Sequence, residues 1–201
     1  MAKGVLEGGR IVALAGVVAV AVLVAVLAAY GTDAEGWRTA ARATARASFV
    51  AFLPVFVASS INGLFGGPAG KWLLRNRRSL GLAFATCHLV HAITFMTYSA
   101  VREQSIAELV SSGTLFGGGA GYVLVALMAV TSTNAAVKRL GRRKWTILHR
   151  TGMYTLAGIF VVTYLGRGLA GEPLGVAAML ALVAALGLRV AARVRLMRRR
   201  R

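Results

Sequence analysis

Three histidines are the side chains of this sequence best suited to chemistry, and two of them lie in one apolar stretch. His88 and His91 are three residues apart between Arg77 and Tyr98, and His149 begins another apolar segment. On a helix, residues three apart share nearly the same face and are separated by a rise of about 4.5 Å. An ionisable side chain is costly to bury in an apolar helix. We therefore expect these histidines to face the interior of a helix bundle and a partner there.

The segments that must position these histidines have the composition of membrane-spanning helices. Of the 201 residues, 57% are hydrophobic and only 15% are charged, whereas soluble proteins carry about 25% charged residues. A membrane helix needs roughly 20 mostly apolar residues. Six segments reach or approach this length: 11–30, 47–65, 80–100, 114–137, 145–165 and 174–190. The sequence thus predicts an all-α, polytopic membrane protein, a six-transmembrane-helix bundle that forms a single domain over residues 1–201.

The first apolar segment has a basic start, as a secretory signal peptide does. Its apolar run is longer than a usual signal core and is followed by further segments of the same kind. We therefore expect it to be retained as a transmembrane helix.

The distribution of basic residues predicts how the six helices are oriented. Two basic residues precede the first segment, four follow the second, five follow the fourth, and seven arginines lie between Arg189 and Arg201. These four regions hold 18 of the 24 basic residues, and five of the six acids lie on the other side. By the positive-inside rule, both termini are cytoplasmic. The net charge of +18 reflects these short clusters beside apolar segments, so we predict contact with the lipid bilayer and no nucleic-acid binding.

The predicted topology makes the third and fifth helices parallel and places the three histidines from the cytoplasmic half to the middle of the bilayer. Imidazoles from two facing helices can bind haem iron axially, and arginines at the cytoplasmic end suit the haem propionates. The candidate iron ligands are His88, His91 and His149. The candidate propionate contacts are Arg77, Arg78, Arg142 and Arg143.

Other chemistries fit these residues less well. A zinc site or a proton relay favours carboxylates within the membrane, and the six segments contain none. A copper site favours thiolate or thioether ligands, but Cys87 and Met96 form no recognisable motif. A single histidine can also serve as a polar contact between helices.

Three motifs occur in order along the central part of the chain. They are RRSLGL (77–82) followed by His91, AVTSTN (129–134) followed by KRLG (138–141), and WTILHR (145–150) followed by Tyr154. Together they resemble the ferric reductase-like transmembrane domain family, in particular its bacterial haem-binding branch, MsrQ (also called YedZ). The resemblance covers residues 77–154, and the six-helix layout extends it to the whole chain.

The resemblance implies a membrane protein with one haem b between the third and fifth helices. His149 from the fifth helix would be one ligand, and His91 or His88 from the third would be the other. The family takes electrons from a cytoplasmic reductase or a quinone and delivers them across the membrane. The chain would then be an oxidoreductase subunit of the bacterial inner membrane that lacks a flavin or nucleotide domain of its own.

In the MsrQ branch the electron acceptor is a periplasmic enzyme, the catalytic subunit of a methionine sulfoxide reductase. A ferric species is the alternative acceptor implied by the wider family. The sequence leaves open whether FMN or a quinone binds in addition to the haem.

One position departs from the family pattern. The family usually has a second histidine in the fifth helix where this chain has Val162. Three alternatives follow: His88 compensates by pairing with His149, His91 and His149 pair across a tilt of the helices, or the chain is a non-catalytic membrane protein that retains the fold with a reduced or lost haem site. A transporter is disfavoured, because the segments contain neither carboxylates nor broken-helix repeats.

Overall fold

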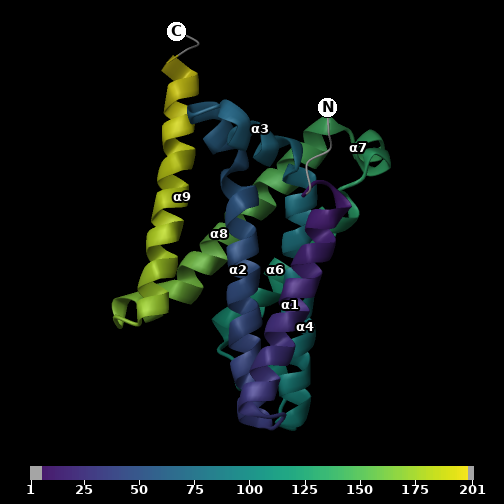
Figure 1. The fold of residues 1–201 in the computed structure, drawn as a ribbon, viewed down its shortest axis with the longest axis vertical. Coiled ribbons are helices and arrows are strands. Elements are labelled where there is room, and N and C mark those ends of the chain that lie inside the picture. The colour runs from purple at the N-terminus through teal and green to yellow at the C-terminus, as the bar shows by residue number, and fades with distance from the viewer. Residues whose placement is uncertain (1–5, 199–201) are drawn as a thin grey trace.

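The computed structural model describes residues 6–198, which are helical almost throughout and contain no strand (Figure 1). The six long helices are α1 (Gly9–Tyr30), α2 (Ala34–Leu64), α4 (Arg77–Val101), α6 (Ser112–Val130), α8 (Arg142–Leu169) and α9 (Pro173–Arg198). The three short helices are α3 (Gly67–Arg75), α5 (Ile106–Leu109) and α7 (Asn134–Leu140). The predicted all-α class is confirmed.

Five of the long helices are long and apolar enough to cross a membrane: α1, α2, α4, α6 and α9. α8 has 28 residues, but basic and other polar side chains occupy much of its first half and lower its mean hydropathy. The chain is therefore a multi-pass membrane protein. A sixth crossing by α8 stays a prediction.

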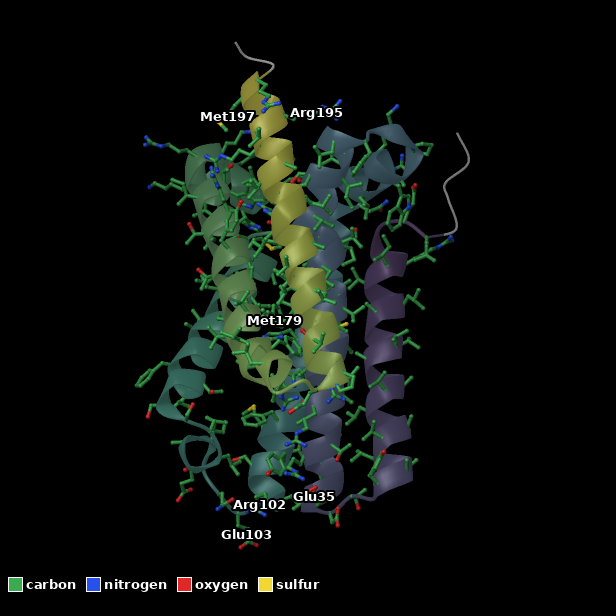
Figure 2. All side chains as sticks on the ribbon, turned by 90° about the vertical axis from the view of Figure 1, so that its left-hand side faces the viewer. Glu35, Arg102, Glu103, Met179, Arg195 and Met197 are labelled. Atoms are coloured by element: carbon green, nitrogen blue, oxygen red, sulfur yellow. The ribbon has the colours of Figure 1, made fainter. Side chains whose placement is uncertain are left out.

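One end of the bundle is basic and the other carries acids. Figure 1 shows that α1 begins and α9 ends at the same end, where α3 and α7 also lie. Figure 2 places Arg195 at this end, and Glu35 and Glu103 at the opposite end. We call the end that contains α3 and α7 the basic end. That it faces the cytoplasm, as the positive-inside rule requires, stays a prediction.

Helix caps move several boundaries away from the predicted ones. α2 begins at Ala34 rather than at residue 47, because the Asp33 side chain accepts a hydrogen bond from the Gly36 N–H (2.9 Å) and the next residues are mainly good helix formers. The segment predicted over 114–137 is split between α6 and α7. The break follows from Thr133, whose hydroxyl caps α7 by accepting from the Ala136 N–H (3.0 Å).

The core is organised around α2, which packs against α1 and α4 on one side and against α9 on another. A chain of aromatic rings crosses it: Phe52 of α2 lies 5.4 Å from Phe84 of α4 and 5.1 Å from Phe160 of α8, between ring centroids. α4 and α8 both begin at the basic end (Figure 1), but they pack scarcely at all on each other. α6 contacts both of them. The predicted pair of facing helices is thus separated by a space near α6.

Candidate functional site

The two histidines of α4 are held by polar residues of α2. His91 Nδ1 lies 3.3 Å from Thr44 Oγ1, and His88 Nδ1 lies 2.8 Å from Ser48 Oγ. Thr44 and Ser48 are both completely buried and one helical turn apart. The two helices therefore fix both imidazoles through the same ring nitrogen.

The hydrogen bonds of Thr44 favour one tautomer of His91. The Thr44 hydroxyl donates to the carbonyl oxygens of Ala40 (2.9 Å) and Ala41 (3.1 Å), so its oxygen accepts the hydrogen bond from His91 Nδ1–H. A neutral imidazole protonated on Nδ1 carries its lone pair on Nε2. Histidines that bind metals commonly have this arrangement, with the other ring nitrogen bonded to an orienting residue. His91 is thus prepared to bind a metal through Nε2.

The ring of Tyr122, from α6, lies against the α4 histidines. Its ring centroid lies 4.5 Å from that of His88 and 6.3 Å from that of His91, and the two imidazoles are 5.8 Å apart. Sequence reasoning missed Tyr122, Thr44 and Ser48. The only signal was the pair of small hydroxyl residues four apart in α2.

His149 lies at the start of α8, in a separate group of contacts. Its ring stacks on Trp145 at 4.2 Å, and its Nε2 lies 3.1 Å from Thr131 Oγ1. The Thr131 hydroxyl donates to the Leu127 carbonyl (2.6 Å), so His149 Nε2–H is the donor to Thr131. Trp145 Nε1 donates to the Thr131 carbonyl (3.0 Å). These contacts join the second and third sequence motifs into one unit.

A cavity of about 530 Å³ opens between α4 and α8 toward the basic end. Most of its wall is apolar and includes Phe84 of α4 and Met128 of α6, while His149 contributes an imidazole. Small-molecule and cofactor sites commonly have a volume of about 300–1,000 Å³, mostly apolar walls and a few polar groups. Four arginines also line the cavity: Arg77, Arg78, Arg150 and Arg189.

Only some of the predicted site residues line this cavity. His149, Arg77 and Arg78 line the cavity. Arg142 and Arg143 are exposed at the start of α8 and do not line it.

His88 and His91 lie farther along α4, beyond Phe84, whose ring lies 5.3 Å from that of His88. The pairing of His149 with His88 or His91 stays a prediction.

Val162, at the position of the missing histidine, is 77% exposed. It lies on the side of α8 opposite the buried residues Phe160 and Tyr164. The position therefore offers neither a ligand nor a contact to the core.

A family model described as the ferric reductase like transmembrane component matches residues 15–161. The chain belongs to this family. The family predicted from the three motifs is thereby confirmed, and the matched range contains both α4 histidines and His149.

The curated relatives include proteins named "Protein-methionine-sulfoxide reductase heme-binding subunit MsrQ". The one from Herminiimonas arsenicoxydans is 34% identical over 96 residues, which are 47% of this chain and 44% of the relative. The one from Azospira oryzae is 34% identical over 130 residues, 62% of this chain and 54% of the relative. The chain thus spans about half the length of these relatives. No solved structure matches the chain.

Proposed function

We propose that this protein is the haem-binding subunit of a membrane redox system and conducts electrons from a cytoplasmic donor to an acceptor on the other side of the membrane. The cavity between α4 and α8 carries the proposal, because it combines an apolar wall with an imidazole and several arginines. The names of the curated relatives support the same assignment.

The residues present fit one haem b. His149 would bind the iron from α8, and His91 or His88 would bind it from α4. The apolar wall suits the macrocycle, and Arg77 and Arg78 suit its propionates. When bound, the haem supplies an iron that accepts and releases one electron.

The remaining tasks belong to side chains of this chain. Thr44 and Ser48 hold the imidazoles of His91 and His88 in place. Thr131 now accepts from His149 Nε2–H, so His149 must give up this hydrogen bond to present Nε2 to iron. Phe84 and Met128 help to exclude water from the cavity.

The two ends of the bundle suit different redox partners. A cytoplasmic reductase or a quinone would donate electrons at the basic end, next to His149. The acceptor would bind at the opposite end. We propose the catalytic subunit of a methionine sulfoxide reductase as this acceptor, because the relatives are named as haem-binding subunits of such a reductase; a ferric species is the second candidate. The protein would act in the inner membrane of a bacterium.

Spectroscopy of the full chain purified in detergent tests the proposal. We expect a Soret band, a reduced-minus-oxidised spectrum of a b-type haem, and one haem per chain. His149→Ala should abolish the haem. Of His88→Ala and His91→Ala, the variant that loses the haem identifies the α4 ligand. A wild-type protein that is folded but has no haem, even after incubation with haemin, contradicts the proposal.

The alternative is a non-catalytic membrane protein that retains the fold. Two observations favour it: Val162 supplies no ligand, and His149 Nε2 is already bonded to Thr131. In that case the haem-free wild type and His149→Ala should both be folded, and neither should take up haemin.

A further inference from the structure

Arg189 is a cation within the membrane helix α9. The fifteen residues before it, 174–188, contain no charged side chain. Within residues 6–198 the salt bridges are Arg38–Glu35 and Arg75–Glu7, so no acid pairs with Arg189. A cation in a membrane helix is costly and usually marks a functional position. We therefore expect a partner group that compensates the positive charge of Arg189.

Protein contacts hold the Arg189 guanidinium in a defined position. It lies between the rings of Phe56 of α2 and Tyr154 of α8, with its Cζ 4.4 Å and 4.5 Å from the two ring centroids. Nε donates to Tyr154 Oη (3.2 Å), and Nη1 donates to the Phe56 carbonyl (2.5 Å). In the described part of the chain, no protein group accepts from Nη2. The plane of the guanidinium is thus fixed while three of its five N–H donors, including both on Nη2, remain available.

Arg189 lines the same cavity as Arg77 and His149. The positive charges of Arg77 and Arg189 repel each other across it. No aspartate or glutamate of the described residues lines the cavity. Two cations beside an apolar cavity are stabilised by an anion, and the planar guanidinium favours a carboxylate because it can form two parallel hydrogen bonds.

We propose that Arg189 binds a carboxylate of the group that occupies this cavity, with Arg77 as a second donor. The inference rests on the proposed haem function, in which that carboxylate is a haem propionate. It assigns a binding role to the last helix, in addition to the arginines of α4.

Reconstitution with haemin and with its dimethyl ester tests this role directly. The ester keeps the macrocycle and the iron but has no carboxylate. In the full chain, Arg189→Gln should weaken the binding of haemin about tenfold or more and leave the binding of the ester unchanged. It should also lower the reduction potential, because loss of a nearby positive charge favours ferric iron.

Arg195→Gln is the matched control. Arg195 lies on the same helix and donates to an α2 carbonyl, that of Leu64, but it does not line the cavity. We expect its affinities for haemin and ester to equal those of the wild type.

Each further outcome contradicts a specific claim. If Arg189→Gln weakens haemin and ester equally, Arg189 acts through the fold and the inference is wrong. If Arg189→Gln does not fold, the wild type alone tests the carboxylate contact. Equal affinities of the wild type for haemin and for the ester would exclude that contact. A wild type that binds neither contradicts the proposed haem function, whereas the other outcomes leave that function intact.

Discussion

Replacing Thr44 with valine tests the link between α2 and the imidazole of His91. Valine has nearly the same shape as threonine, so the substitution exchanges a hydroxyl for a methyl group. The hydrogen bonds from Thr44 to Ala40 and Ala41 lie within α2, and their loss should cost little because such bonds stabilise a helix little or not at all. The important loss is the acceptor for His91 Nδ1–H.

The size of the effect follows from burial. Thr44 is 0% exposed, so no water can take the place of its hydroxyl at that position. A buried donor without a partner costs about 1–3 kcal/mol. The imidazole can avoid this cost by moving its proton to Nε2, but it then loses the lone pair that would bind iron. We therefore expect lower stability without haem and, from comparable changes at metal sites, about 10–100-fold weaker haem binding.

Two assays measure these effects, with a control on the neighbouring helix. Thermal unfolding of the haem-free protein in detergent reports stability, and haemin titration reports affinity. Thr94 is also 0% exposed, but its hydroxyl donates only to the Val90 carbonyl of its own helix (2.8 Å). Thr94→Val should change neither quantity appreciably. Equal losses in Thr44→Val and Thr94→Val, or no loss in either, would refute the assigned role of Thr44.

Two further predictions concern packing and a helix cap. Gly175→Ala should destabilise the protein by about 1–3 kcal/mol, because the added Cβ would lie 2.7 Å from the Arg167 carbonyl carbon. A lower Tm would show this loss. Gly187→Ala is the control and should leave the Tm unchanged, because no atom lies within 4 Å of its added Cβ. The Ser105 hydroxyl and amide donate hydrogen bonds to the Glu108 carboxylate at the start of α5 and lower the pKa of that carboxyl group. This helix cap is therefore fully formed above the usual carboxyl pKa and is lost as the pH falls through the lowered value. The protection of the Ser105 amide against hydrogen exchange, taken relative to the intrinsic rate at each pH, should fall at acid pH, whereas in Glu108→Ala this protection should be absent at any pH. Unchanged protection in that variant would contradict the assignment.

The sequence by itself determined the class of protein, because that class depends on local properties of the chain. The lengths of the apolar runs predict long membrane helices. The spacing of the basic clusters predicts that α3 and α7 lie at the end of the bundle where α1 begins and α9 ends, as Figure 1 shows. The three motifs were sufficient to predict the family. Helix boundaries were less predictable. The first turns of α2 contain arginines, so a hydropathy pattern excludes them from the membrane segment, although they are helical and follow the N-cap residue Asp33.

Only the tertiary structure decided which residues surround the histidines. Thr44 and His91 are 47 residues apart, and Arg189 and Phe56 are 133 apart. Such contacts depend on how each helix is rotated and tilted against its neighbours, which the period of a single helix does not specify. The sequence predicted that α4 and α8 face each other. In the structure α4 and α8 scarcely pack on each other while α6 contacts both, so that a cavity lies between them and an arginine of α9 lines it.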